Sequence, residues 1–307
     1  MDRGHRPVLL EEAIAALMVS ADGTYVDGTF GRGGHATRIL ESLSPQGSLL
    51  ALDQDPEAAA VAELICANDS RMRFRSTNFR ALADCAALGS VQGVLLDLGV
   101  SSPQLDNPAR GFSFSHDGPL DMRMDPEGGQ SAADWLANVK EAELARVLKE
   151  LGEERFARRI ARAIVNARRE GPIQRTAHLA EIISAANPKW EPNKHPATRS
   201  FQAIRLHINS ELESLQDALS AALSVLAKGG RLVVISFHSL EDRIVKRFIR
   251  NASRGRQLPP GVPISFEEQQ VSLKPIGKAV MPSPTEVAAN LPPTGWPMSK
   301  RLSSQEC

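Results

Sequence analysis

Five short apolar runs alternate with helical patterns along this chain and predict the strands of a sheet. Each run is bounded by Gly, Pro, Asn or Asp, and the runs cover residues 24–27, 48–53, 72–77, 93–98 and 231–237. Helical patterns lie at 7–17, 35–43 and 56–67. Such alternation predicts a doubly wound α/β fold, in which helices cover both faces of a mostly parallel sheet and ligands bind at the carboxyl ends of the strands.

The alternation stops between Leu98 and Arg231, and the pattern there predicts an inserted helical domain. Helical patterns cover 131–136, 141–151, 153–169 and 176–186, a proline-spaced loop follows at 188–196, and one long helix is expected from Thr198 onward. We therefore place an inserted domain at 106–206, within a discontinuous domain made of 1–105 and 207–307. The Pro-, Gly-, Ser- and Gln-rich sequence after Arg250 predicts loops, one late strand and a poorly ordered end.

The composition changes this picture little. With 307 residues and 42% hydrophobic content, the chain can bury one large core and a second, smaller one. No apolar run is long enough to span a bilayer and no signal peptide is visible, so we expect a cytoplasmic protein without a membrane partner. Cys66, Cys85 and Cys307 are far apart in sequence, which argues against disulfides and against a zinc site.

The charges are unevenly distributed although the net charge is zero. Residues 1–105 carry 8 basic against 13 acidic side chains, and 106–139 carry 2 against 6. Residues 140–206 carry 14 against 8, and 207–307 carry 12 against 9. The basic second half permits an anionic partner such as a nucleic acid without requiring one.

A glycine-rich turn follows the first predicted strand, in the sequence Asp-Gly-Thr-Phe-Gly-Arg-Gly-Gly-His at 27–35. Such glycines let the backbone approach a ligand at a helix start, although a merely tight turn is the alternative. The second strand ends at Asp53, 20 residues beyond Gly33, where nucleotide-binding sheets place a carboxylate that accepts hydrogen bonds from ribose hydroxyls. A helix cap before Pro56 is the alternative for Asp53. Both features fit either a dinucleotide or S-adenosylmethionine.

The fourth predicted strand places Asp97 at the same carboxyl edge. Methyl transfer to an exocyclic amine needs acceptors that hold the N–H groups and localise the lone pair for attack. General amino-methyltransferases carry a [DNS]-P-P-[YFW] motif at this place, and only the Asp matches here. The spacing alone leaves amino-methylation open.

Several longer stretches resemble one family, the bacterial ribosomal RNA small-subunit methyltransferase H family, also called MraW or RsmH. They are HRPVLL at 5–10, the glycine-rich turn, LLDLGVSSPQLD at 95–106, RGFSF at 110–114, DGPLDMRM at 117–124, GEER at 152–155, HPATRSFQAIR at 195–205 and ISFHSLEDR at 235–243. The family usually ends in a segment like N-P-R-A-R-S-x-x-L-R, whereas here Asn290 is followed by Leu-Pro-Pro-Thr-Gly-Trp-Pro. That departure affects the last strand and not the cofactor site.

The resemblance implies a Rossmann-like methyltransferase fold with a helical insert, and S-adenosylmethionine as cofactor. It implies methylation of N4 of a cytidine in 16S ribosomal RNA, with the small ribosomal subunit as the expected setting of that RNA, and leaves a homodimer open. The cofactor contacts that it implies are Gly33, Gly34, His35, Asp53, Phe79, Asp97 and Gln104, with Asp97 as the catalytic residue. Phe79 follows the third strand, where its ring can stack on adenine or simply pack in the core.

Two basic stretches are candidates for RNA contact. The stretch 153–169 has one apolar helical face and carries six arginines largely elsewhere, and 243–256 holds six basic residues and no acidic one. The candidates are Arg158, Arg159, Arg162, Arg199, Arg243, Lys246, Arg247 and Arg250. Ordinary solvated faces are the alternative. Phe112, Phe114 and Phe237 could stack on bases, although packing is the more common role.

Asp117, Asp121 and Asp125 recur every fourth residue, but Gly118 and Pro119 oppose a regular helix, and methyl transfer requires no metal. We expect loop capping and arginine pairing for these acids, and no metal. Alternative functions are a methyltransferase for DNA or a protein amide, a cofactor-binding RNA chaperone without turnover, and, less favoured, a nicotinamide enzyme.

Overall fold

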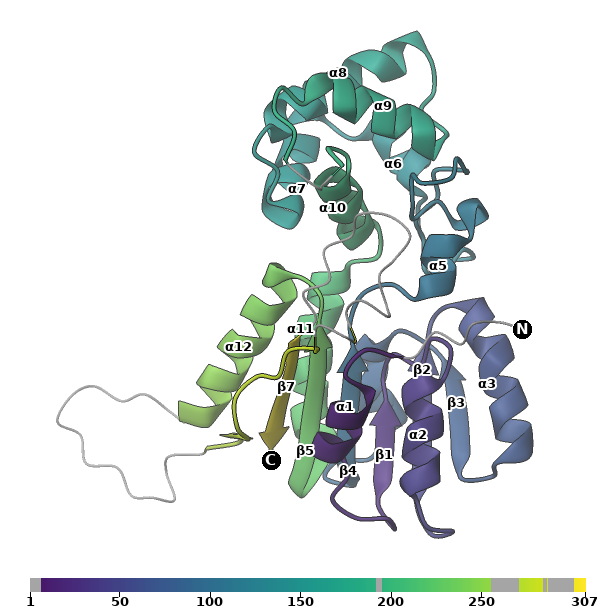
Figure 1. Cartoon of the computed structure of the whole chain (residues 1–307), viewed down its shortest axis with the longest axis vertical. Coiled ribbons are helices and arrows are strands. Elements are labelled where there is room, and N and C mark those ends of the chain that lie inside the picture. Colours follow the sequence, from purple (N-terminus) through teal and green to yellow (C-terminus); the bar gives the residue numbers. More distant parts are fainter. Residues whose placement is uncertain (1–6, 192–194, 255–270, 284–285, 287–300) are drawn as a thin grey trace, which may run out of the picture. The chain divides into compact units, whose positions relative to one another are not determined.

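The computed structural model describes residues 7–191, 195–254, 271–283, 286 and 301–307. These residues form two compact units (Figure 1). The sheet unit contains the described residues up to Gly99 and those from Leu212 onward, and the helical unit contains those from Val100 to Glu211. The sequence placed the limits of the insert at 106 and 206.

The sheet unit is built on a seven-stranded sheet of the described residues. Its strands are β1 (Thr24–Asp27), β2 (Ser48–Asp53), β3 (Met72–Ser76), β4 (Val91–Asp97), β5 (Leu226–Ser236), β6 (Lys274–Pro275) and β7 (Arg301–Glu306). The order across the sheet is β3-β2-β1-β4-β5-β7-β6. β1 to β5 pair in parallel, whereas β7 is antiparallel to β5 and to β6.

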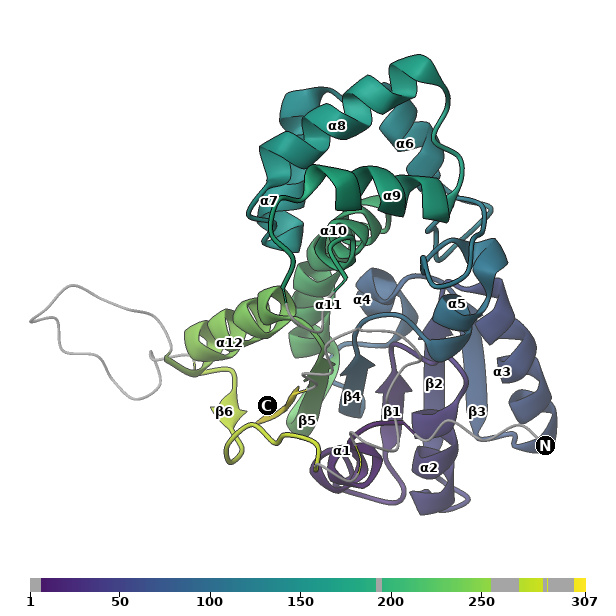
Figure 2. The same cartoon turned by 45° about the horizontal axis from the view of Figure 1, so that its top comes forward.

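Helices cover both faces of this sheet (Figures 1 and 2). Successive strand residues point to opposite faces, so Tyr25 packs with α1 (Leu10–Leu17), α2 (Gly34–Ser42) and α3 (Pro56–Asn68). Its neighbour Val26 packs with α4 (Leu82–Cys85), α11 (Glu211–Val225) and α12 (Ser239–Arg254). Near-continuous apolar strands are what a sheet buried on both faces requires. The predicted doubly wound, mostly parallel fold is confirmed.

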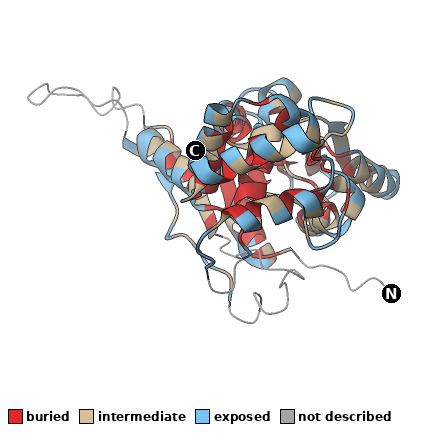
Figure 3. Ribbon diagram, turned by 90° about the horizontal axis from the view of Figure 1, so that it is seen from above, coloured by how far each residue is buried: buried red, intermediate tan, exposed pale blue. Residues whose placement is uncertain are grey.

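The helical unit has a hydrophobic core of its own. Its helices are α5 (Ser102–Asp106), η2 (Pro108–Arg110), α6 (Ala132–Asn138), α7 (Glu141–Gly152), α8 (Ala157–Glu170), α9 (Thr176–Ala186) and α10 (Thr198–Ile208). Leu144, Ile160, Ile183 and Phe201 come from four of these helices and are at most 1% exposed. The helices bury one face and expose the other, as the red and pale blue sides of the ribbon show in Figure 3.

The prediction of one long helix from Thr198 is wrong, because the chain forms two helices, α10 and α11, with a break at Asn209 and Ser210. Ser210 adopts a left-handed φ of 47°. The side-chain amide of Asn209 donates to the carbonyl oxygen of Met122, and its oxygen accepts from the Met124 amide. Asn209 therefore binds the loop around Met122 and Met124 at the position where the predicted helix would have continued.

Two further boundaries differ from the sequence pattern. The helix expected from 153 begins at Ala157, because Glu153 has a left-handed φ of 50° and ends α7. β5 begins at Leu226 instead of Arg231, since Leu226 pairs with Val91 of β4 across a register shift, and Gly229 and Gly230 exchange backbone hydrogen bonds with Cys307. The late strand expected in the tail is present as β7, with the short β6 beside it, while the rest of the expected tail lies largely outside the described residues.

Candidate cofactor and catalytic site

The register of the sheet brings three carboxylates to one edge. Asp27, at the end of β1, lies opposite Ala51 of β2 and Leu95 of β4. β2 and β4 each continue for two residues beyond these partners and end at Asp53 and Asp97. All three carboxylates therefore lie at the carboxyl ends of adjacent parallel strands. The turn after β1 crosses between them, because the Phe30 amide donates to the Leu52 carbonyl and the Gly28 amide to the Leu95 carbonyl.

Glycine is required at several positions of this turn. Gly31 and Gly33 have left-handed φ values of 55° and 75°. A Cβ on Gly28 would lie 2.6 Å from Cδ2 of Leu96, and a Cβ on Gly34 would lie 2.4 Å from Cγ of Pro7. Gly33 is also the N-cap of α2, so the first amides of that helix begin at the turn. The turn therefore has the conformation of an anion-accepting helix start.

Asp53 holds the turn in place. One of its carboxylate oxygens accepts from the Gly31 amide at 2.8 Å and the other from the Asp55 amide at 2.9 Å. Burial raises the pKa of Asp53 above its ordinary value, against the opposing effect of these hydrogen bonds. The helix cap is Asp55, whose carboxylate accepts from Glu57. Each oxygen of Asp53 keeps acceptor capacity for a ribose hydroxyl, since a carboxylate has about four lone-pair sites.

Asp97 is the last residue of β4 and lies beside the glycine-rich turn. Its backbone amide donates to the Thr29 hydroxyl at 2.6 Å, and its carboxylate is 3.5 Å from Nε2 of His35. The Asp97 side chain is 18% exposed. A partly exposed carboxylate next to the glycine-rich turn can accept a hydrogen bond from an incoming amine. Thr29 was not predicted as a site residue, and a hydroxyl inside a turn gives little signal in sequence.

Asp27 is a buried carboxylate that the sequence analysis did not assign. It is 1% exposed, one oxygen accepts from the Thr29 amide at 3.1 Å, and the other has no hydrogen-bond partner among the described residues. Burial raises the pKa of Asp27 to about 6, and the nearby His35 opposes that rise. Asp27 ends an apolar strand as Asp97 does, so the reasoning used for Asp97 could have found it.

His35 brings an unsatisfied ring to the same place. It stands in the first turn of α2, is 5% exposed, and neither ring nitrogen has a hydrogen-bond partner in the described part of the chain. Buried polar atoms without partners carry a free-energy cost, which a bound ligand with hydrogen-bonding groups would remove. This supports the prediction that His35, with Gly33 and Gly34, faces a ligand.

The two remaining cofactor candidates differ in position. Phe79 begins the short helix η1 (Phe79–Ala81), is half-buried, and its Cβ lies 3.4 Å from where a side chain on Gly28 would begin. Phe79 is therefore next to the turn. Gln104 lies in α5 of the helical unit, where its side-chain oxygen accepts from the Ser101 amide at 2.9 Å and caps that helix. Its contact with a cofactor stays a prediction.

The end of β5 completes this edge of the sheet unit. Phe237 follows β5, and its ring lies 3.2 Å from where a Cβ on Gly99 would stand. Glu241, 1% exposed, accepts from the amides of Phe237 and His238 at 2.8 and 3.0 Å and so fixes the start of α12. Sequence reasoning missed Glu241, although an acid three residues after a helix start is a known capping signal.

The predicted RNA contacts lie on exposed helix faces, with one exception. Arg158, Arg159 and Arg162 are exposed on α8, and only Arg162 has a carboxylate, Glu141, within ion-pair distance among the described residues. On α12 the predicted contacts Arg243, Lys246, Arg247 and Arg250 are exposed, as is Arg254, and Lys246 pairs with Asp242. Arg199 is the exception, because its side chain is half-buried, pairs with Glu191 and donates to the Glu153 carbonyl.

The acids at every fourth position have the expected structural roles. Asp117 pairs with Arg175 at 2.6 Å and Asp121 with Arg123 at 2.7 Å, while Asp125 accepts from the Glu127 amide within its own turn. The arginine partners hold the pKa values of Asp117 and Asp121 below their ordinary range. The described residues contain no group of three or more His, Cys, Asp or Glu placed to hold a metal ion. All three cysteines are free, as predicted.

The strand order, the double layer of helices and the glycine-rich turn define the class of this protein as a Rossmann-like α/β fold of the methyltransferase type. The chain belongs to the MraW methylase family, whose family model matches residues 2–295. The family resemblance in the sequence is thereby confirmed. No helix among the described residues is long and apolar enough to cross a membrane.

Known proteins are similar to this chain at two levels. The ribosomal RNA small subunit methyltransferase H of Nitrosococcus oceani is 56% identical over 291 residues, which covers 93% of this chain and 92% of that protein. A putative rRNA methylase from Clostridium thermocellum has a TM-score of 0.42 at 11% identity, covering 97% of this chain and 92% of that structure. A putative methyltransferase from Streptococcus mutans in complex with SAH has a TM-score of 0.42 at 10% identity, covering 97% and 94%. The two structural similarities are too low to carry an argument.

Proposed function

We propose that this chain transfers a methyl group from S-adenosylmethionine to the exocyclic N4 amine of a specific cytidine in 16S ribosomal RNA. The observation that carries the proposal is the 56% identity, over almost the whole of both chains, to a relative named ribosomal RNA small subunit methyltransferase H. The chain is a methyltransferase of the MraW family. The arrangement of carboxylates around the glycine-rich turn supports the same reaction.

The residues at this edge fit the cofactor. Asp53 has spare acceptor capacity for the ribose hydroxyls, and the Phe79 ring can stack on adenine. The backbone amides of Gly33 and Gly34 lie at the start of α2, where they can donate to the carboxylate of the cofactor's amino acid part. The unpartnered nitrogens of His35 can bind polar groups of the amino acid part. When bound, S-adenosylmethionine supplies an electrophilic methyl group on a sulfonium. Gln104 is a further proposed contact.

Asp97, at the carboxyl end of β4 and 18% exposed, is the residue proposed to bind the amine and accept its proton. Its carboxylate accepts a hydrogen bond from an N–H group of the N4 amine, which orients the nitrogen lone pair for in-line attack. As the carbon–nitrogen bond forms and the carbon–sulfur bond breaks, the amine loses a proton, and Asp97 is the nearest proposed acceptor. Nε2 of His35 lies 3.5 Å from the Asp97 carboxylate, within ion-pair distance but without a hydrogen bond to it. Thr29 fixes the backbone of Asp97 through its hydroxyl.

The RNA is proposed to contact the exposed basic faces of α8 and α12. Arg158 and Arg159 lack carboxylate partners among the described residues, so their charges are available to phosphate. Arg199 remains a proposed contact of a weaker kind, since its guanidinium already holds Glu191 and Glu153. The small ribosomal subunit as the setting of the RNA, a homodimer and a cytoplasmic location all stay predictions.

Two measurements test the proposed function. Purified protein incubated with methyl-labelled S-adenosylmethionine should label 16S ribosomal RNA or the small subunit, and neither DNA nor protein. Mass spectrometry of ribosomal RNA from cells lacking this gene should show one N4-methylated cytidine missing, and the gene with Asp97→Asn should fail to restore it. RNA binding without labelling would favour a chaperone, and labelling of DNA or protein would change the substrate class.

A further inference from the structure

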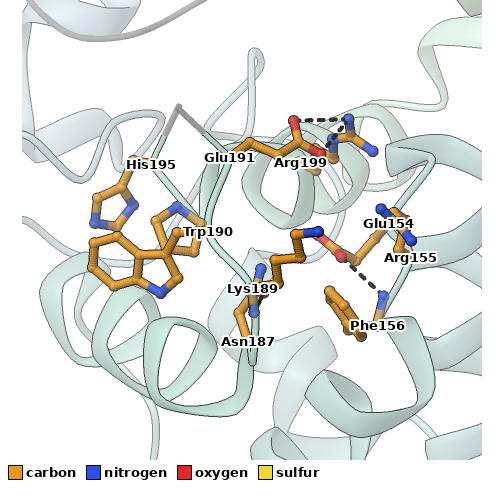
Figure 4. A pocket seen from close by; sticks show the side chains of 10 residues that line it. Glu154, Arg155, Phe156, Asn187, Lys189, Trp190, Glu191, His195 and Arg199 are labelled. Atoms are coloured by element: carbon orange, nitrogen blue, oxygen red, sulfur yellow. Dashed lines mark hydrogen bonds and ion pairs between the residues drawn. The ribbon is translucent and has the colours of Figure 1, made fainter. Parts of the chain in front are cut away.

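A second candidate binding site lies wholly within the helical unit. A pocket is formed between the turn joining α7 to α8 and described residues that lie between α9 and α10, within 187–191 and 195–196 (Figure 4). The lining residues that matter here are Glu154, Arg155, Phe156, Lys189, Trp190 and His195. None of them belongs to the proposed cofactor and catalytic site.

Aromatic rings form one wall of this pocket. Trp190 is 61% exposed and is the only aromatic side chain among the large exposed hydrophobic residues of the described chain. Its ring centroid is 6.1 Å from that of His195, and Figure 4 shows the two rings side by side. His195 in turn lies 4.5 Å from Phe114, which packs edge-on against the buried Phe201. A stack that starts in the core therefore ends in an indole that is open to solvent.

His195 contributes a neutral ring to this wall. Its Nδ1 accepts a hydrogen bond from the Ala197 amide at 3.2 Å, which places the ring proton on Nε2. Desolvation also lowers the pKa of His195 below its ordinary value. Arg199 links the residues around this wall, since it pairs with Glu191 at 2.9 Å and donates to the Glu153 carbonyl at 2.7 Å.

The opposite side of the pocket carries charged groups. Glu154 is 5% exposed, and one of its oxygens accepts from the Phe156 amide at 3.0 Å. Lys189 and Arg155 are exposed, and neither forms an ion pair with a carboxylate among the described residues. Arg155 lies over the Phe156 ring at 5.9 Å. A largely buried acceptor thus stands between two available cations and faces the aromatic wall (Figure 4).

We propose that this pocket binds one unpaired nucleotide of the RNA substrate, distinct from the nucleotide that is methylated. The base stacks on Trp190 beside His195, and Glu154 accepts a hydrogen bond from an exocyclic amine of cytosine or adenine. Lys189 and Arg155 bind the phosphates on either side of that base. This inference rests on the proposed function, because it assigns part of the RNA to the helical unit.

An aromatic side chain of a protein partner is the competing occupant. The cations favour RNA, since Lys189 and Arg155 give the pocket two charges that a neutral aromatic residue does not use. The arginine face of α8 begins directly after this pocket with Arg158 and Arg159, so a phosphate backbone can continue from one to the other. A protein partner therefore becomes an outcome of the test and not the proposal.

The test measures binding of the full-length protein to unstructured oligocytidylate and oligouridylate by fluorescence anisotropy. Trp190→Ala should weaken oligocytidylate binding by roughly 5- to 100-fold, the range for loss of one stacked base, and Trp190→Phe should restore most of it. Glu154→Gln keeps the oxygen that accepts from Phe156 and should reduce the preference for cytidine over uridine. Leu88→Ala, at another exposed apolar side chain, is the matched control and should change neither value.

Separate readouts distinguish the failure of this inference from the failure of the proposed function. Binding of S-adenosylhomocysteine and the thermal unfolding midpoint should be unchanged in all variants. If the parent protein methylates 16S ribosomal RNA while Trp190→Ala binds and methylates it equally well, the pocket is not an RNA site and the proposed function stands. If the parent binds no RNA, the proposed function itself is wrong. Equal binding of both oligonucleotides by the parent would overturn the role of Glu154.

Discussion

Asp97 and Asp27 end neighbouring strands of one sheet, yet their surroundings give them different properties. Asp97 is 18% exposed and faces the edge where an amine can approach. Asp27 is 1% exposed, and burial raises its pKa to about 6. The exposed carboxylate is suited to bind and deprotonate a substrate, whereas the buried one carries a desolvation cost and a partnerless oxygen.

Replacing Asp97 tests the catalytic role at this scale. Asp97→Asn keeps the size of the side chain and its backbone bond to Thr29, but it removes the anionic acceptor. We expect the rate constant of methyl transfer to fall by about 10²- to 10⁴-fold in single-turnover assays, with the midpoint of unfolding unchanged. A rate within about threefold of the parent, a barrier change under about 1 kcal/mol, would remove Asp97 from the chemistry.

Replacing Asp27 tests the cost of its burial. The unfolded chain releases this proton near its ordinary pKa of 3.8 and the folded protein near 6, so between these values the folded state holds the extra proton. The contribution of Asp27 to the free energy of unfolding therefore falls as the pH rises, by roughly 3 kcal/mol at most over that window. Asp27→Asn keeps the acceptor for the Thr29 amide and removes the titration.

Urea unfolding at a series of pH values checks this expectation. Relative to the parent, Asp27→Asn should gain stability progressively between about pH 4 and pH 6 and keep that gain at pH 7. Thr37→Ser, a change in the helix α2 that follows the glycine-rich turn, leaves the charge unaltered and should show no such pH dependence. A difference between Asp27→Asn and the parent that stays constant with pH would mean that Asp27 is not buried as a raised-pKa carboxyl.

At the scale of elements, the two basic helices combine a buried face with an exposed basic one. On α8 the side chains of Ile160 and Ile164 are fully buried while Arg158, Arg159 and Arg162 are exposed. Arg168, on the same helix, is tied to the carbonyls of Leu136 and Val139 and so belongs to the structure of the helical unit. The arginines of one helix therefore divide into a structural group and an available group.

The available group on α8 makes a quantitative prediction. Replacing Arg158, Arg159 and Arg162 by Gln should weaken RNA binding and reduce the slope of log affinity against log salt by about 0.7 per lost phosphate contact. Affinity for S-adenosylhomocysteine should not change. The matched control replaces Arg73, Arg75 and Lys228, which are exposed in the sheet unit, by Gln. An unaltered slope in the α8 variant would identify an ordinary solvated face and direct the search to α12.

At the scale of the whole molecule, the chain divides its tasks between two units. The sheet unit holds six of the seven predicted cofactor residues, and the helical unit holds Gln104 and the basic face of α8. Most of the excess basic charge in the sequence, 14 basic against 8 acidic residues, lies in 140–206. The predicted cofactor contacts are thus concentrated in the sheet unit, whereas the predicted RNA contacts occur in both units.

This division predicts how the cofactor product stabilises the protein. S-adenosylhomocysteine at about 100 times its dissociation constant should raise the free energy of unfolding by about 2.7 kcal/mol in the parent. Asp53→Ala should weaken binding by roughly 1–3 kcal/mol, because it removes both the ribose acceptor and the bond that holds Gly31, and so should lower the stabilisation at the same ligand concentration. Calorimetry and thermal unfolding measure both quantities. Equal binding by the variant would leave Asp53 only the role of holding the turn.

Local signals made much of the fold predictable. β1 and β2 have the bounds that the sequence predicted, because Gly and Asp end short apolar runs there. Errors arose where distant residues decide. The helix from Thr198 is broken where Asn209 binds Met122 and Met124, and β5 is longer because Leu226 pairs with Val91 and the two glycines pair with Cys307. Among site residues, Asp53 and Asp97 were found from strand ends, whereas Thr29 and Glu241 were not.

The sequence by itself determined the alternation of strands and helices, the glycine-rich turn, the carboxylates at strand ends and the family. These follow from local periodicity, backbone freedom and short motifs, which need no knowledge of distant contacts. Only the tertiary structure decided that Asp27 is buried with a raised pKa, that the ring nitrogens of His35 have no hydrogen-bond partner among the described residues, and that Arg199 is engaged by Glu191 and Glu153. The physical reason is that burial, charge pairing and hydrogen-bond satisfaction depend on groups far apart in the chain, which only folding brings together.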